Sequence, residues 1–357
     1  MRRFVATTVG SLPDMAEVAT AAVPTPAARG LAMPPEFAAH ERTYLAWPCR
    51  RELWGPTLDA AKAQYAGVAN AVAAFEPVTM ACADAADAAE ARAALAGEVE
   101  VVELPLDDSW LRDSGPAWLL SADGTERVGV HFGFNAWGQK FSGWERDAAV
   151  GARLVEHARD EVVTAPFVLE GGSFALDGAG TLLTTEQCLL HPSRNPTWSR
   201  EDLEGGLRDY LGVERVVWLG DGLAEDRDTD GHVDLVAVCP RRGTVLLQST
   251  APGTPDHVAM ADNHARARDA GLEVLDFPLL AHAEVAGEVV VCSYLNLYLS
   301  DRFAVVPLAG APTDDEALER IADALGGQEV VGVPGDVLAY GGGGPHCITQ
   351  QLPRRSA

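Results

Sequence analysis

The stretch at residues 57–105, TLDAAKAQYAGVANAVAAFEPVTMACADAADAAEARAALAGEVEVVELP, decides the fold class. Its apolar residues first recur at the spacing of one helix face, and the strand-like run PVTMACA follows. A second helical segment and a second strand, EVEVVELP, repeat the pattern. Strands that alternate with helices are typical of α/β proteins. The sequence therefore predicts an α/β fold.

The same alternation continues to the end of the chain. Further strands are expected at residues 127–134, 161–169, 181–190, 215–220, 233–240, 244–250, 273–279, 294–301, 302–308 and 329–335. Helices are expected at residues 147–159, 199–211, 257–271 and 314–327. No long low-complexity linker and no sequence-level repeat divides this series. We therefore expect one continuous domain that begins near Met33.

The charge balance excludes several classes of partner. The chain carries 27 Lys and Arg against 52 Asp and Glu, a net charge of −25. This excess argues against nucleic acid and anionic membranes as partners, and no apolar run approaches the roughly 18 residues that a membrane helix needs. An acidic protein suits a cationic substrate, although acidic surfaces also serve solubility.

Residues 1–32 are expected to form a flexible N-terminal extension. Arg2 and Arg3 precede a mildly apolar stretch with features of an export signal, but Pro13 and Glu17 interrupt that stretch. The six cysteines form no C-x-x-C pair, so neither a zinc site nor a dense disulfide framework is indicated. We predict a cytoplasmic protein, with export through the N-terminal segment as the alternative.

Five segments place polar side chains beside glycines or at strand ends, where a packed core disfavours them. They are DDSWLRDSGP with Asp113, NAWG with Trp137, LEGGSF with Glu170, DTDGHVD with His232 and Asp234, and GGGGPHCITQQ with Cys347. Each also has a purely structural interpretation. Asp113 and Glu170 can cap turns, Trp137 can pack in the core, and a buried cysteine can be inert.

The DTDGHVD segment carries the most chemistry. His232 and Asp234 are expected on one face at the start of an apolar strand, with room beside them at Gly231. A histidine beside a carboxylate serves proton transfer or metal binding. Asp228 and Asp230 strengthen the metal alternative.

Cys347 directly follows four consecutive glycines, which allow a loop to approach a ligand closely. With a distant histidine and a carboxylate, this cysteine matches the arrangement of covalent catalysis. A cysteine protease is one candidate. The surplus of carboxylates at Asp113, Glu170 and Asp234 instead favours a substrate with delocalised positive charge.

Seven motifs resemble the agmatine deiminase and bacterial-type peptidylarginine deiminase family. Between about residues 33 and 353 they are, in order, HERTYLAWP, DDSWLRDSGP, FNAWGQKF, EGGSFALDGAGTLLTTEQCLL, DTDGHVD, SYLNLYLSD and GGGGPHCITQQLP. The family belongs to the guanidine-modifying enzymes. The resemblance implies one catalytic domain at residues 33–357, folded as a five-bladed α/β propeller with the active site at its centre.

The resemblance also implies roles for individual residues. Cys347 would be the nucleophile and His232 the general acid and base. Asp113 and Asp234 would hold the guanidinium nitrogens, and Glu170 would orient His232. The remaining implied substrate contacts are Trp110, Trp137 and Gly344. No metal and no organic cofactor is implied.

The implied reaction is hydrolytic deimination of agmatine to N-carbamoylputrescine and ammonia through a thiouronium on Cys347, a step of putrescine biosynthesis. Free arginine, peptidyl arginine or another guanidino metabolite is the alternative substrate, and amidino transfer the alternative reaction. A non-catalytic binder of guanidino or polyamine cations, and a metal-dependent hydrolase built on His232, are the alternatives outside this class. The expected partners are a small cationic guanidino substrate and, as a homodimer, a second copy of the chain.

Overall fold

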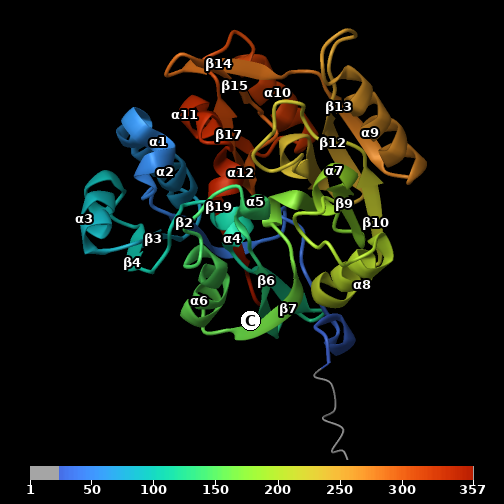
Figure 1. Ribbon diagram of the computed structural model, residues 1–357, viewed down its shortest axis with the longest axis horizontal. Coiled ribbons are helices and arrows are strands. Elements are labelled where there is room, and N and C mark those ends of the chain that lie inside the picture. The colour runs from blue at the N-terminus through green and yellow to red at the C-terminus, as the bar shows by residue number, and fades with distance from the viewer. Residues whose placement is uncertain (1–23, 357) are drawn as a thin grey trace, which may run out of the picture.

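The fold repeats one unit, in which an antiparallel pair of strands is extended by a helix and a parallel third strand (Figure 1). The computed structural model describes residues 24–356. Five of its six sheets contain this unit, and the sixth is a separate hairpin. The α/β prediction is therefore confirmed, and the repeat that no sequence similarity revealed is present in the topology.

The first unit contains the stretch that decided the fold class. Its strands β2, β3 and β4 are parallel and are joined by helices α2 and α3. Their bounds are His40–Ala46, Val78–Cys82, Glu100–Glu103, Leu58–Ala73 and Ala85–Ala94. Helix α3 begins where the side chain of Asp84 accepts hydrogen bonds from the N–H groups of Ala86 and Asp87, as an N-cap does. The helices and strands predicted there are confirmed.

The last strand of the chain completes this first sheet. Strand β19 (Thr349–Pro353) pairs antiparallel with β2, so that Thr349 lies opposite Leu45. The short helix α12 (Pro345–Ile348) immediately precedes β19. The C-terminal segment with Cys347 is therefore anchored on the first long strand rather than frayed.

Three further units follow in chain order. The second consists of β5 (Ala117–Ser121), β6 (Arg127–Gly133), α6 (Val150–His157) and β7 (Glu161–Val168). The third consists of β8 (Phe174–Leu176), β9 (Thr181–Thr185), α8 (Arg200–Leu211) and β10 (Arg215–Leu219). The fourth consists of β11 (Ala237–Arg241), β12 (Thr244–Gln248), α9 (His257–Asp269) and β13 (Glu273–Phe277).

The fifth unit follows the separate hairpin β14 (Ala281–Val285) and β15 (Glu288–Cys292). It consists of β16 (Tyr298–Leu299), β17 (Phe303–Leu308), α10 (Asp314–Ala324) and β18 (Glu329–Pro334). Helix α10 buries Ala317, Ile321 and Ala324 at the spacing of one helix face. Full burial of a side chain such as Ile321 stabilises the fold by about 1.5–3 kcal/mol.

Short helices and turns lie between the units or between the strands and the longer helix of one unit. They are α1 (Arg51–Trp54), α4 (Leu111–Ser114), α5 (Ala136–Gln139), α7 (Glu186–Leu189), α11 (Asp336–Tyr340), and the 3-10 turns η1 (Ala27–Arg29), η2 (Gly55–Thr57), η3 (Asp147–Ala149), η4 (Gly171–Ser173) and η5 (Val233–Leu235). In Figure 1, α4, α5 and α12 lie near the middle of the molecule, while α3, α8 and α9 lie toward its outside. Strand β19, which follows α12, lies beside them near the middle.

Several strand predictions were wrong in extent. Residues 181–190 form β9 and then α7, because Thr185 caps a helix with its side-chain oxygen on the N–H of Cys188. Residues 233–240 begin with the turn η5, and only Tyr298–Leu299 of residues 294–301 is a strand. No strand was predicted at the positions of β1, β5, β8, β14, β15 and β19.

Ordered structure begins before Met33. Residues 24–32, which we expected to belong to a flexible extension, include η1 and the strand β1 (Leu31–Ala32), which pairs antiparallel with β5. Arg29 also forms ion pairs of 2.6 Å with Glu126 and 2.7 Å with Glu161. The segment with Arg2, Arg3, Pro13 and Glu17 lies outside the described residues. Over residues 24–356, no helix has both the length and the apolar character needed to cross a bilayer.

Candidate active site

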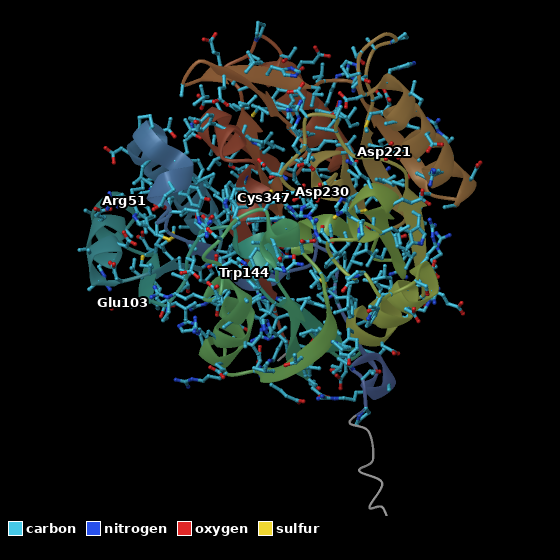
Figure 2. The ribbon with its side chains drawn as sticks, viewed as in Figure 1. Arg51, Glu103, Trp144, Asp221, Asp230 and Cys347 are labelled. Carbon is cyan, nitrogen blue, oxygen red and sulfur yellow. The ribbon has the colours of Figure 1, made fainter. Side chains whose placement is uncertain are left out.

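The five ionisable residues predicted at the site lie together, and each comes from a connection between units. Asp113 lies in α4, Glu170 precedes η4, His232 precedes η5, Asp234 lies within η5, and Cys347 lies in α12. All five side chains are buried. Figure 2 places Cys347 near the middle of the molecule, whereas Arg51 and Glu103 lie near its edge. The tertiary structure thus gathers residues that are far apart in the sequence.

Cys347 lies against a carboxylate. Its Sγ atom is 3.4 Å from Oδ2 of Asp234, and its backbone N–H donates to Oδ1 of Asn296 over 3.3 Å. Burial and the negative charges of Asp234 and Asp113 raise the pKa of the Cys347 thiol well above its usual range. The free site therefore holds a protonated thiol at neutral pH.

The glycines before Cys347 serve close packing more than unusual backbone angles. Only Gly342 has a positive φ, of 105°. A Cβ atom on Gly341 would lie 2.2 Å from Trp54, and one on Gly343 would lie 2.8 Å from Sγ of Cys347 and 2.8 Å from Trp110. The loop therefore touches the nucleophile and the aromatic residues beside it with its bare backbone.

Gly344 packs against Asn296. Gly341 and Gly342 line the pocket described below, whereas a Cβ atom on Gly344 would lie 2.8 Å from Oδ1 of Asn296. The substrate contact at Gly344 that the resemblance implied stays a prediction. The lack of a side chain at Gly344 lets Asn296 reach the N–H of Cys347.

Asp113 is held in place by two donors. Its Oδ2 accepts from Nε1 of Trp137 over 2.8 Å, and its Oδ1 accepts from the N–H of Gly172 over 2.9 Å. Trp137 has a φ of 53°, a left-handed conformation that is rare and costly for a bulky residue. Burial raises the pKa of Asp113, although His232 opposes the shift. The residue with the strained backbone, Trp137, is thus the one that donates a hydrogen bond to Asp113.

His232 lies among three carboxylates. Its Nδ1 is 3.8 Å from Asp113 and 4.0 Å from Asp234, and its Nε2 is 3.8 Å from Oε2 of Glu170. Among the described residues, neither ring nitrogen has a hydrogen-bond partner. Burial would lower the pKa of His232, but Asp113 and its other neighbours outweigh burial and raise it well above its usual value.

His232 and Asp234 are close, but not for the reason that the sequence analysis assumed. We expected both on one face of a strand, whereas Val233–Leu235 is a 3-10 turn and the strand β11 begins only at Ala237. The turn is held because Oδ2 of Asp226 accepts from the N–H groups of Gly231 and His232. A turn that is held by a side-chain acceptor leaves no alternating pattern of apolar and polar residues, so the sequence did not reveal it.

Arg194 is a site residue that the sequence analysis missed. Its Nε donates to Oε1 of Glu170 over 2.7 Å, and its Nη1 donates to Oδ2 of Asp230 over 2.6 Å. Burial would raise the pKa of Glu170, but His232 and Arg194 outweigh burial and lower it. Glu170 therefore faces His232 as an anion. Only its position one residue before the Asn195–Pro196 pair marks Arg194 in the sequence.

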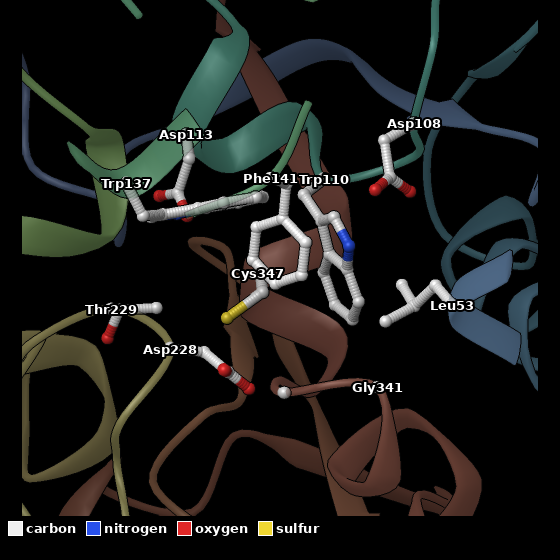
Figure 3. Close-up of a pocket in the computed structure, with 11 residues that line it drawn as sticks. Leu53, Asp108, Trp110, Asp113, Trp137, Phe141, Asp228, Thr229, Gly341 and Cys347 are labelled. Atoms are coloured by element: carbon white, nitrogen blue, oxygen red, sulfur yellow. The ribbon is translucent and has the colours of Figure 1, made fainter. Parts of the chain in front are cut away.

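A pocket opens beside Cys347 (Figure 3). Its lining residues are Leu53, Asp108, Trp110, Asp113, Trp137, Phe141, Asp228, Thr229, Gly341, Gly342 and Cys347. Trp110 stacks on Trp54 with ring centroids 5.8 Å apart. Trp110 and Trp137, which the resemblance implied as substrate contacts, both line this pocket, and the carboxylates of Asp108, Asp113 and Asp228 line it with them. Aromatic faces and carboxylates together suit a flat cation.

One group of side chains could offer ligands to a metal ion. One ligand atom from each of Glu170, Cys188 and His232 lies within 4.8 Å of the others. The guanidinium of Arg194 is already bound to Glu170, and its positive charge opposes a second cation there. The expected metal alternative relied on Asp228 and Asp230. Asp230 is paired with Arg194 and Lys140, and neither carboxylate belongs to this group of possible ligands. The donor set therefore fits a metal poorly.

Comparison with known proteins agrees with these features. A model of the Porphyromonas-type peptidyl-arginine deiminase family matches residues 32–353. An agmatine deiminase of Stutzerimonas stutzeri is 40% identical over 360 residues, which cover 92% of this chain and 97% of that protein. An agmatine deiminase of Pseudomonas fluorescens is likewise 40% identical, over 92% of this chain and 97% of its own.

A solved structure extends the similarity to the fold. The agmatine deiminase of Enterococcus faecalis superposes with a TM-score of 0.88 at 33% identity, over 94% of this chain and 99% of that chain. The match to the family model spans almost all of the described residues and includes every segment that forms the pocket. The chain belongs to the Porphyromonas-type peptidyl-arginine deiminase family.

Proposed function

We propose that this protein is a hydrolase that deiminates agmatine to N-carbamoylputrescine and ammonia. One observation carries the proposal: a cysteine, a histidine and the carboxylates of Asp113 and Asp234 converge on one buried site with an aromatic-walled pocket. Two carboxylates complement a planar cation with several N–H donors. The 40% identity to agmatine deiminases supports this choice of guanidino compound.

The proposed chemistry assigns one task to each residue. Asp113 and Asp234 hold the nitrogens of the guanidinium, and the thiolate of Cys347 attacks its central carbon. His232 protonates the departing ammonia, which leaves a thiouronium on the sulfur. The same histidine then takes a proton from a water molecule, and the water attacks the carbon and breaks the C–S bond. Glu170, an anion 3.8 Å from Nε2, stabilises the charged form of His232.

Substrate binding itself would favour ionisation of the thiol. The negative charges of Asp234 and Asp113 are among the causes that raise the pKa of Cys347 in the free site. A guanidinium bound between these carboxylates compensates their charge and adds a cation beside the sulfur. The pKa of the thiol then falls, so the thiol releases its proton to solvent and the thiolate forms where its target is already bound.

Asp228 provides a basis for the choice of substrate. It lines the pocket together with Gly341 and Gly342, on the side of Cys347 away from Asp113 and Trp137 (Figure 3). An ammonium at the far end of the substrate would be attracted to this carboxylate, whereas the α-carboxylate of arginine would be repelled by it. We infer that the pocket prefers agmatine to arginine.

The wider architecture is part of the proposal. We infer that the five repeated units are the blades of a five-bladed α/β propeller whose central connections carry the site, and that the catalytic domain predicted at residues 33–357 also includes the preceding segment with η1 and β1. The free thiols of all six cysteines fit a reducing compartment such as the cytoplasm. A homodimer is the proposed assembly, and putrescine biosynthesis is the proposed pathway.

A substrate panel tests the function. Agmatine, free arginine and a blocked arginyl peptide are supplied separately to the purified protein, and ammonia and the ureido product are quantified. We expect release from agmatine with a kcat/KM at least about 100-fold above that for arginine. In D228N this preference should shrink, because the repulsion of the α-carboxylate is removed. Ammonia release from arginine alone would reassign the substrate, and no release from any compound would refute a hydrolase.

A further inference from the structure

His346, the residue directly before Cys347, bridges two carboxylates. Its Nδ1 lies 2.8 Å from Oδ2 of Asp234, and its Nε2 lies 2.7 Å from Oε1 of Glu36. The ring is buried. An ionised carboxylate only accepts hydrogen bonds, so each ring nitrogen must carry a proton to satisfy both partners. His346 is therefore an imidazolium between two anions.

The charges around the ring support this protonation state. Burial and Arg112 lower the pKa of His346, but Glu36 and Asp234 outweigh them and raise it. Burial would raise the pKa of Glu36, but His346 and Arg112 outweigh burial and bring it down to about 2. Burial likewise opposes ionisation of Asp234, whereas the hydrogen bond from His346 lowers its pKa.

Arg112 connects the chain of charges to the helix that carries Asp113. Its Nη1 lies 3.1 Å from Oε1 of Glu36, and its Nε donates to the carbonyl oxygen of His346 over 3.2 Å. The charges of these four side chains thus alternate in sign: Asp234 is negative, His346 positive, Glu36 negative and Arg112 positive. It joins the segment before β2, helix α4, turn η5 and helix α12, which all border the site.

The two oxygens of Asp234 have different surroundings. Oδ2 receives the hydrogen bond from His346 and lies 3.4 Å from Sγ of Cys347. Oδ1 lies 4.0 Å from Nδ1 of His232 and has no hydrogen-bond partner among the described residues. A donor fixed on Oδ2 sets the rotation of the carboxylate and leaves Oδ1 available for a donor of the substrate.

We propose that His346 is a positioning residue whose Nδ1–H holds Asp234 ionised and oriented for the guanidinium, beside the sulfur of Cys347. This inference rests on the proposed function, because it assigns a task within the same reaction. His346 acts through Asp234 and does not have to contact the substrate. The hydrogen bond from Nδ1 is expected to affect substrate binding and turnover, whereas the hydrogen bond from Nε2 only holds the ring in place.

A matched pair of substitutions separates the two donors. In H346N the amide nitrogen of asparagine takes the place of Nδ1, so the donor to Asp234 is kept and the donor to Glu36 is lost. In H346Q the amide nitrogen of glutamine takes the place of Nε2, so the donor to Glu36 is kept and the donor to Asp234 is lost. Both variants remove the same positive charge. Any difference between them therefore reports which hydrogen bond acts.

The measurement is the affinity for agmatine, by calorimetry in the C347A background where no turnover occurs, together with kcat and KM of the variants with an intact cysteine. We expect H346Q to bind agmatine at least about 10-fold more weakly than H346N and to lose at least about 100-fold more in kcat/KM. Equal losses in both variants would overturn the inference and leave His346 as a stabilising element only.

E36Q provides a second variant in case H346Q does not fold. A neutral His346 still donates Nδ1–H to Asp234, and the glutamine amide donates to Nε2, so agmatine affinity should change less than about 3-fold. A loss of 10-fold or more in E36Q would overturn the inference. If the wild-type protein releases no ammonia from any guanidino compound, the proposed function itself fails, which is a distinct result from an active wild type with equal variants.

Discussion

The sulfur of Cys347 lies 3.4 Å from Oδ2 of Asp234, although 113 residues separate the two in the chain. A carboxylate at this distance opposes ionisation of the thiol, so the arrangement is unfavourable for a free nucleophile. It becomes favourable when a cation lies between the carboxylates. Through this contact, the positive charge of the proposed substrate would favour ionisation of the Cys347 thiol.

Removal of the thiol should abolish turnover without unfolding the protein. We expect C347A to lower kcat for ammonia release from agmatine by at least about 10⁴-fold, because the thiol that would form the covalent intermediate is removed. Its melting temperature should stay near that of the wild type. C82A, which removes a buried thiol from β3, should keep the kcat of the wild type. Retained ammonia release in C347A would disprove the covalent mechanism.

The hydrogen bond from Trp137 to Asp113 should contribute directly to catalysis. W137F keeps an aromatic wall but removes the Nε1 donor that lies 2.8 Å from Oδ2 of Asp113. A hydrogen bond to a buried carboxylate contributes about 1.5–3 kcal/mol, so kcat/KM should fall about 10- to 100-fold. W144F is the matched control and should change kcat/KM less than about 2-fold. A W137F variant as active as W144F would show that Trp137 only packs.

The absence of a side chain at Gly343 should matter for the position of the nucleophile. In G343A the new Cβ would lie 2.7 Å from Cβ of Cys347 and 2.8 Å from Trp110, so one of these side chains must move. A displacement of about 1 Å at a reacting group costs about 100-fold in rate, which is the loss that we expect in kcat/KM. G205A, in the open environment of helix α8, should leave activity unchanged and stabilise the helix by about 0.5–1 kcal/mol.

The pH dependence of activity should respond to Glu170. Several neighbours, Glu170 among them, raise the pKa of His232 despite its burial, and the proposed mechanism needs the protonated ring as an acid. Activity should therefore fall on the alkaline side as His232 loses its proton. E170Q removes one anion, so the alkaline limb of the kcat/KM profile should move to lower pH by about one unit. E103Q, at an exposed position on β4, should leave the profile unchanged.

Asp147 should make stability depend on pH in a defined direction. Burial raises its pKa to about 7, and its Oδ1 accepts from the N–H groups of Asp107 and Asp108. The folded state thus binds this proton more tightly than the unfolded chain. For this group, the free energy of unfolding decreases as pH rises from about 4 to about 7.

The substitution D147N retains an acceptor oxygen and removes the titration. It should raise the free energy of unfolding by about 3–4 kcal/mol near pH 8 and leave it nearly unchanged near pH 4. Urea denaturation at both pH values measures this difference. D209N, at an exposed position on α8, should alter neither value. A variant that is equally stabilised at both pH values would contradict the assignment.

Much of the fold was accessible from local patterns, and the exceptions are informative. The apolar spacing of residues 57–105 predicted α2, β3, α3 and β4, because packing against a single core face imposes that spacing. The strand predicted at residues 233–240 begins only at Ala237, because the side chain of Asp226 stabilises a turn before it. Strand β19 was missed, because TQQLP has no strand pattern and owes its place to pairing with β2.

The sequence by itself determined the α/β class and the types of residue that carry the chemistry, since periodicity and motifs are local properties. Only the tertiary structure decided that Asp113, Glu170, His232, Asp234 and Cys347 share one site, and it added contacts that no motif indicated, from Arg194 to Glu170 and from His346 to Asp234 and Glu36. The physical reason is that these contacts join side chains of different units. Their geometry depends on how β19 closes onto β2 and how the connections meet at the centre, which no spacing along the chain encodes.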